Sequence, residues 1–189
     1  MPSFHLDNEE IELVPETKLL GIVIRNDMSW ISNTQYMVTK AYKKLWILRR
    51  LKRLGATQND LLDIYVKQVR SHLEYAIPVW HSALTGDQRL QIERVQKSAL
   101  RIILGAQYTS YTSALKILKI DTLNNRRIKL CKKFAVKTSK NEKFNKWFKV
   151  NDISSLTRLK KNPYCPVYSR TKRFENSPIS YITNLLNSM

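Results

Sequence analysis

A run of basic and aromatic residues between positions 40 and 53 has the chemistry of a polyanion-binding surface. Its cations are Lys40, Lys43, Lys44, Arg49, Arg50, Lys52 and Arg53, and Tyr42 and Trp46 lie among them. No Asp or Glu occurs from Met28 to Asn59. Lysine and arginine bind phosphates with release of counterions, and aromatic rings stack on bases or ribose. We expect these cations to contact an anionic partner, because like charges repel one another on a purely structural helix. Trp46 is expected in the core.

A second basic stripe consists of Arg94, Lys97 and Arg101. On a helix these side chains fall opposite the apolar positions Ile92, Val95, Ala99, Ile102 and Ile103. Such a helix buries one side and presents cations on the other. We expect the cationic helix faces to line one groove that holds a nucleic-acid duplex.

The overall composition agrees with a nucleic-acid partner. The 189 residues include 33 Lys and Arg against 15 Asp and Glu, a formal net charge of +18. With 43% apolar residues the chain can bury a core, which excludes outright disorder. No apolar run approaches the roughly 18 residues of a spanning helix, and the N-terminus lacks the pattern of a secretory signal. We expect an intracellular protein, in the nucleus or cytoplasm, without a membrane span.

Residues for catalysis or metal binding are scattered. The chain has no glycine-rich phosphate loop, no nucleophile elbow and no HExxH helix. Cys131 and Cys165 lie far apart and outside any CxxC pair, so neither zinc nor a disulfide is expected. The N-terminal acids are interpreted as a solvated hairpin edge rather than a metal site. We therefore predict no catalytic residue, no metal ligand and no cofactor in this chain.

The elements that carry these residues are mostly helices, since only four glycines occur and long stretches lack Gly and Pro. At the N-terminus, residues 11–14 and 19–24 are β-prone runs separated by Pro15, Glu16 and Thr17, which predicts a β-hairpin. A helix is predicted from Asn33 to Leu54, with Asn33 or Thr34 as its cap and Gly55 after its end.

Further helices are predicted at 57–77, limited by Pro78, and at 87–104, closed by Gly105. Shorter basic helices follow at 112–119 and 123–138. The expected fold is mainly α, in four parts. Residues 1–32 hold the hairpin, 33–105 a three-helix bundle, 106–149 a basic helical connector, and 150–189 a loosely ordered tail.

Four motifs follow one another along the chain: KLLGIVI at 18–24, MSW at 28–30, LEYAIPVW at 73–80 and RVQKSALRIILG at 94–105. In this order they resemble the region after the palm domain in reverse transcriptases of non-LTR (LINE-type) retrotransposons, especially jockey-like elements of animals. The resemblance covers about residues 10–135, and LEYAIPVW is its most specific part.

The resemblance implies that the hairpin is the palm edge, with primer-grip positions Lys18, Leu20 and Gly21, and that the three long helices are the thumb. The thumb of this family closes over the minor groove of the template–primer duplex. The cations of 40–53 and of the second stripe are then duplex contacts. The implied partners are an RNA/DNA hybrid or a DNA duplex, and the remainder of a polymerase.

The family's catalytic aspartates have no counterpart in this sequence. We therefore expect a fragment that binds nucleic acid without sequence preference and is inactive alone as an RNA-directed DNA polymerase. Magnesium is expected only in the missing palm. The alternative is a basic helical interaction protein that binds an acidic protein or an anionic membrane surface.

Overall fold

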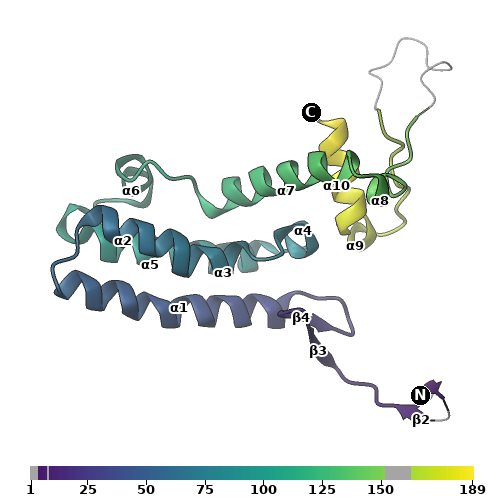
Figure 1. Ribbon diagram of the computed structural model, residues 1–189, viewed down its shortest axis with the longest axis horizontal. Coiled ribbons are helices and arrows are strands. Elements are labelled where there is room, and N and C mark those ends of the chain that lie inside the picture. The colour runs from purple at the N-terminus through teal and green to yellow at the C-terminus, as the bar shows by residue number, and fades with distance from the viewer. Residues whose placement is uncertain (1–3, 8, 152–162) are drawn as a thin grey trace.

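The computed structural model describes residues 4–7, 9–151 and 163–189 and is mainly helical (Figure 1). Two short antiparallel hairpins come first, β1 (Phe4–Leu6) with β2 (Glu9–Ile11) and β3 (Glu16–Leu19) with β4 (Ile22–Arg25). Helices follow to the C-terminal end. The predicted mainly α fold, with an N-terminal hairpin before a helical bundle, is confirmed.

The β3–β4 hairpin turns at Leu20 and Gly21, not at Pro15 to Thr17 as predicted. The two turn residues have φ angles of +47° and +84°, the combination found in two-residue hairpin turns of type I′. Glycine adopts such a conformation without steric cost. The turn therefore divides the apolar run 19–24, and the predicted strands at 11–14 and 19–24 are wrong in their bounds.

Helix α1 (Ile31–Arg53) starts before the predicted caps. Asn33 and Thr34 are buried in its first turn and do not cap it. The Asn33 side chain instead accepts a hydrogen bond from the backbone N–H of Val23 at 3.2 Å, which joins the helix to β4. The predicted end is confirmed, because Gly55 follows the last turn with a φ of +83°.

The second long helical segment consists of α2 (Gln58–Ile64), the π-helical η1 (Tyr65–Arg70) and α3 (Ser71–Glu74). Thr57 caps it in a reciprocal capping box with Asp60. The segment ends at Glu74, earlier than the predicted residue 77. Ala76 has a φ of +50°, and the chain then starts the short α4 (Ile77–Trp80).

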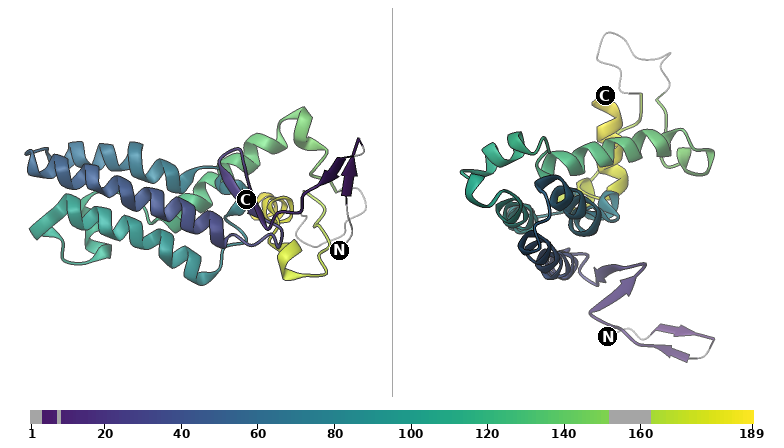
Figure 2. Two further views of the ribbon diagram at one scale, coloured as in Figure 1. Left: turned by 90° about the horizontal axis from the view of Figure 1, so that it is seen from below. Right: turned by 60° about the vertical axis from the view of Figure 1, so that its left-hand side comes forward.

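Helices α1, α2–α3 and α5 (Gly86–Leu104) lie side by side (Figure 2). Their shared core contains fully buried side chains such as Leu45, Tyr65, Leu73 and Val95. Each apolar side chain of this size contributes roughly 1.5–3 kcal/mol when it leaves water. As predicted, Gly105 closes α5.

In the described part of the chain the remaining helices are η2 (Gly105–Gln107), α6 (Tyr111–Ile117), α7 (Leu123–Ser139), α8 (Glu142–Asn145), α9 (Lys172–Glu175) and α10 (Pro178–Asn187). Helix α7 lies over the bundle and packs against α10 (Figure 1). The side chain of Glu74 anchors α7, since its Oε1 lies 3.0 Å from Nε of Arg126.

The prediction of a loosely ordered tail at 150–189 is wrong for its last part. Residues 152–162 lie outside the described residues, but α10 is a regular helix. Ile182, Leu185 and Leu186 follow one another at helical spacing and are buried. This apolar face packs on α7 and explains why the segment is ordered.

Candidate nucleic-acid interface

A cleft of about 330 Å³ lies where the β3–β4 turn meets α1 and α3. We call it the hairpin cleft. It brings together three of the predicted nucleic-acid-binding residues, Lys18 and Gly21 from the hairpin and Lys40 from α1. Among the described residues the lining consists of Lys18, Gly21, Tyr36, Met37, Lys40, His72 and Tyr75, none of which is a carboxylate.

Tyr36 positions the two ammonium groups of the hairpin cleft. Lys18 Nζ donates a hydrogen bond to the Tyr36 hydroxyl at 2.7 Å. Lys18 Nζ and Lys40 Nζ lie 4.7 Å and 4.4 Å from the centroid of its ring, within the range of cation–π contacts. Hydrogen bonds from Lys18 and then Lys40 lower the pKa of the Tyr36 phenol. Within the described residues neither lysine forms an ion pair.

Lys44 and His72 complete the polar surroundings of the cleft. Lys44 is half-buried on the same side of α1 as Lys40, one turn further along the helix. Burial lowers the pKa of His72, and the charges of Lys44 and Lys40 lower it further. This shift disfavours the charged imidazole, and Lys18 and Lys40 supply the positive charge of the cleft.

Tyr75 holds the hairpin turn against the bundle. Its hydroxyl donates to the backbone oxygen of Leu20 at 2.8 Å, and its own backbone oxygen accepts from Nε1 of the buried Trp80 at 2.9 Å. The Leu20 side chain is 81% exposed, so only the backbone of this predicted site residue takes part. Motif LEYAIPVW thus supports the turn of motif KLLGIVI.

Sequence reasoning named none of Tyr36, His72 and Tyr75 as a site residue. Tyr36 stands four residues before Lys40, so the two share one helix face. That spacing is the one signal in the sequence that points to it. His72 and Tyr75 reach the cleft only through the packing of α3 on α1.

The outer face of α1 carries an exposed basic and aromatic surface, which we call the α1 ridge. It consists of Tyr42, Lys43, Trp46, Arg49, Arg50 and Arg53. Trp46 is 64% exposed, so its predicted place in the core is wrong. Leu45 and Leu48 fill the core on the opposite side of the helix. An exposed indole among arginines is a surface on which bases can stack.

Lys52, predicted as a nucleic-acid contact, is engaged within the bundle. Its Nζ donates to the backbone oxygens of Ile102 and Ile103, the latter at 3.2 Å. These carbonyls belong to the last turn of α5, where cations satisfy acceptors that have no helical partner. Lys52 therefore joins α1 to α5.

In the predicted stripe of α5, Arg94 and Arg101 are exposed on the outer face, opposite the buried residues, as predicted. Lys97 is half-buried and lines a pocket between α5 and α7. Lys97 Nζ lies 5.1 Å from the Tyr111 ring centroid and Arg101 Cζ 5.3 Å from that of Tyr108.

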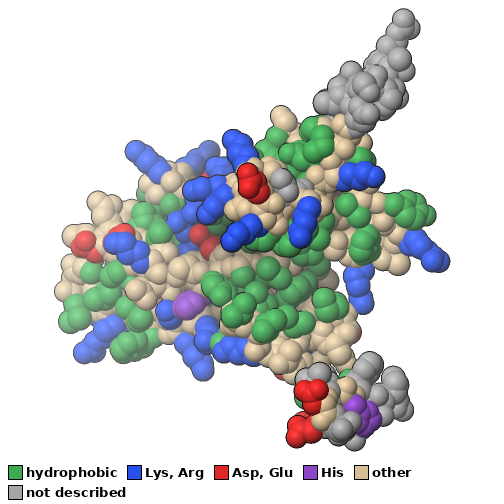
Figure 3. Space-filling model, turned by 45° about the vertical axis from the view of Figure 1, so that its right-hand side comes forward, with side chains coloured by type: hydrophobic (Ala, Val, Ile, Leu, Met, Phe, Trp, Pro, Cys, Tyr) green, Lys and Arg blue, Asp and Glu red, His purple; other side chains and the backbone are tan. Residues whose placement is uncertain are grey.

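The stripe and the α1 ridge each lie opposite the buried face of their own helix, so they point away from the bundle axis in different directions. Figure 3 shows Lys and Arg on both the upper and the lower parts of the helical body. The expected single groove lined by all cationic faces is not formed.

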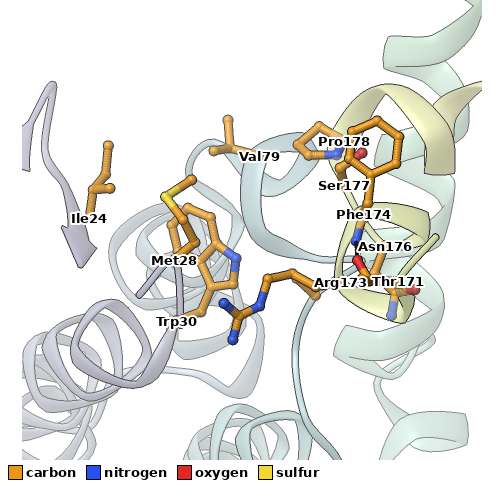
Figure 4. Close-up of a pocket in the computed structure, with 11 residues that line it drawn as sticks. Ile24, Met28, Trp30, Val79, Thr171, Arg173, Phe174, Asn176, Ser177 and Pro178 are labelled. Carbon is orange, nitrogen blue, oxygen red and sulfur yellow. Dashed lines mark hydrogen bonds between the residues drawn. The ribbon is translucent and has the colours of Figure 1, made fainter. Parts of the chain in front are cut away.

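An apolar pocket of about 430 Å³ separates the hairpin from the C-terminal helices (Figure 4). Met28 and Trp30 line one side, Phe174 and Pro178 line the other, and Arg173 reaches toward Trp30. Arg173 is the one ionisable residue in the described lining. The pocket lies between the segment 24–30, which leads from β4 into α1, and the segment 171–178 around α9, and it offers little polar chemistry.

Over residues 4–7, 9–151 and 163–189, no group of three or more His, Cys, Asp or Glu is placed to hold a metal ion. No helix of this described part is long and apolar enough to cross a membrane. Comparison with family models, with curated proteins and with solved structures finds no match.

Proposed function

We propose that the chain binds the sugar–phosphate backbone of a nucleic-acid duplex without sequence preference. The observation that carries this proposal is the hairpin cleft, in which one tyrosine ring holds the ammonium groups of Lys18 and Lys40 and the described lining has no carboxylate. Two cations in such a setting favour a phosphate partner.

The α1 ridge extends this surface along the helix. Helix α1 has 23 residues and is therefore about 35 Å long, close to the roughly 34 Å of one duplex turn. Arg49, Arg50 and Arg53 then follow the backbone while Trp46 stacks on a base or ribose. Lysine and arginine contacts to phosphates position a protein on a duplex and carry no sequence information.

The four motifs suggest the context of this activity, a thumb-like segment of a non-LTR retrotransposon reverse transcriptase. In this proposal the turn at Leu20 and Gly21, supported by Tyr75, contacts the primer strand, and Lys18 and Lys40 bind its phosphates. The chain alone is expected to bind a template–primer duplex and to incorporate no nucleotide when magnesium is added.

Fluorescence anisotropy with a labelled RNA/DNA hybrid tests the proposal. Lys18→Gln combined with Lys40→Gln should weaken binding about tenfold or more at moderate salt, since two phosphate contacts are lost. The matched control is Lys132→Gln with Lys133→Gln, which removes two exposed charges from α7. Its affinity should fall only slightly.

An equal loss of affinity in both double variants would show that net charge, not the cleft, determines binding. Retention of an acidic protein that survives nuclease and high salt, without affinity for the hybrid, would favour the alternative of a protein partner.

A further inference from the structure

A buried arginine on α7 points to a second site. Arg127 is fully buried, and it belongs to the face of α7 that packs into the protein. Leu123, Cys131 and Ala135 stand at four-residue intervals from it on that face, and all three are buried as well. A guanidinium thus occupies a position where the pattern calls for an apolar side chain.

The Arg127 guanidinium has no partner within the described part of the chain. Its Nε, Nη1 and Nη2 make no hydrogen bond there. Glu93 is the nearby acid, but its Oε1 accepts from the Tyr111 hydroxyl and from the Leu123 N–H at 3.1 Å. Arginine remains protonated in proteins. The charge of Glu93 acts on Arg127 through space, but buried N–H donors without acceptors remain destabilising.

Arg127 lines a pocket of about 470 Å³ between α5 and α7, which we call the α5–α7 pocket. Arg89 and Lys97 from α5 add two more cations to its lining, and Glu93 is the one carboxylate of the described lining. Thr122 and Asn124 stand at the N-terminus of α7, a 17-residue helix. The positive end of its dipole adds to the potential at the pocket.

We propose that the α5–α7 pocket binds a phosphate group through Arg127, Arg89 and Lys97. A guanidinium offers two parallel N–H donors that match two oxygens of a phosphate. A bound phosphate supplies the acceptors that Arg127 lacks. Three cations face one carboxylate, Glu93, in the described lining, so an excess of positive charge remains for the phosphate. The pocket shares no residue with the hairpin cleft or the α1 ridge, so the inference does not rest on the proposed function.

Thermal unfolding in inorganic phosphate and in chloride at equal ionic strength tests the site. A ligand that binds only the folded state raises Tm in a saturable way, so phosphate should raise the Tm of the wild type. Arg127→Met should unfold in chloride at the same temperature or higher, because it replaces an unpaired buried charge by an apolar side chain. It should show no response to phosphate.

The matched control is Lys132→Met, which removes an exposed cation from the same helix and should keep the full phosphate response. Arg89→Gln is a second variant, at an exposed position of the lining where folding is not at risk. It should require about tenfold more phosphate for the same rise in Tm, because it loses one charge-assisted contact to the phosphate. An unchanged phosphate response in Arg127→Met or Arg89→Gln, or no response in the wild type, overturns the proposal.

The phosphate can be free or part of a nucleic-acid strand, and the hybrid-binding assay distinguishes these sources. If the pocket takes a backbone phosphate, Arg127→Met also loses affinity for the hybrid. If it takes free phosphate, that variant loses only the Tm response. The Lys18→Gln and Lys40→Gln double variant should keep the Tm response, so failure of the hairpin cleft and failure of the pocket give different results.

Discussion

Gly21 is the residue whose backbone conformation shapes the hairpin cleft. Its φ is +84°, and a Cβ built there would lie 3.5 Å from Cε1 of Tyr75, an ordinary contact. Gly21→Ala should therefore lower the free energy of unfolding by about 1 kcal/mol through backbone strain rather than a clash. Urea denaturation measures this loss.

The control for Gly21 is Gly86→Ala. Gly86 stands at the start of α5 and has open space around a built Cβ. This variant should be neutral or stabilised by a few tenths of a kcal/mol, because alanine lowers the entropy of the unfolded chain. Equal destabilisation by the two substitutions would show that the positive φ of Gly21 is not the cause.

Lys52 and Arg53 are adjacent basic residues with different roles. Lys52→Met removes the donor to the last carbonyls of α5 and should lower the free energy of unfolding by about 1 kcal/mol. Arg53→Met removes an exposed charge of the α1 ridge and should leave stability within about 0.5 kcal/mol. Hybrid binding should follow the reverse order, with the larger loss for Arg53→Met. Thermal unfolding and anisotropy on the same two variants check both statements.

At the scale of elements, His81 couples the end of α4 to α10. Its ring meets that of Tyr181 edge-on, with centroids 5.8 Å apart. Burial, with smaller effects from Arg127 and Arg89, lowers the pKa of His81 from 6.5 to about 4. Between these pH values the unfolded chain binds a proton that the folded protein does not. Stability is therefore fully present above pH 6.5 and falls as the pH drops toward 4.

This shift predicts a loss of at most about 3 kcal/mol between pH 7 and 4, at 1.36 kcal/mol per pKa unit. His81→Phe keeps an aromatic ring against Tyr181 and should remove most of that loss. The smaller loss of stability that remains in His81→Phe should come in part from His72, whose pKa is also lowered. His5→Gln, at an exposed position of β1, is the control and should lose as much stability as the wild type over this pH range. Urea denaturation at each pH would contradict the assignment if His81→Phe lost stability in parallel with the wild type.

The helices were predictable because their signals are local. The capping box at Thr57 and the glycines after α1 and α5 act within one turn. The hairpin was predicted with wrong bounds because its turn interrupts an apolar run and is supported by Tyr75, 55 residues away along the chain. Helix α10 was missed because its ordering depends on α7.

The kind of site, a cationic surface, was predictable from the sequence, but only some of the residues that form it were. Excess charge and the motifs indicated Lys18, Gly21 and Lys40, which share the hairpin cleft. Residue type alone did not distinguish Lys52, which caps α5, from its neighbours on the α1 ridge. It also did not reveal that Trp46 faces outward. Both roles depend on how one helix is rotated against the others.

At the scale of the whole molecule, the cations are distributed over several faces, so a rigid duplex can contact only some of them. The hairpin cleft and the α1 ridge adjoin on α1, whereas the α5 stripe points in another direction. We therefore expect the duplex to lie along α1. Each phosphate contact that is removed makes the negative slope of log K against log salt shallower by about 0.9.

This expectation can be measured with two variants of equal charge loss. The slope should become shallower by about 2 in the Lys18→Gln and Lys40→Gln double variant, since both lysines contact phosphates. It should change by much less in Arg94→Gln with Arg101→Gln, because these charges act only from a distance and are screened beyond about 10 Å at 0.1 M salt. Anisotropy titrations over a salt series give both slopes. The reverse ranking would place the duplex on α5, because the salt slope depends on the cations that contact phosphates and hardly on distant charges.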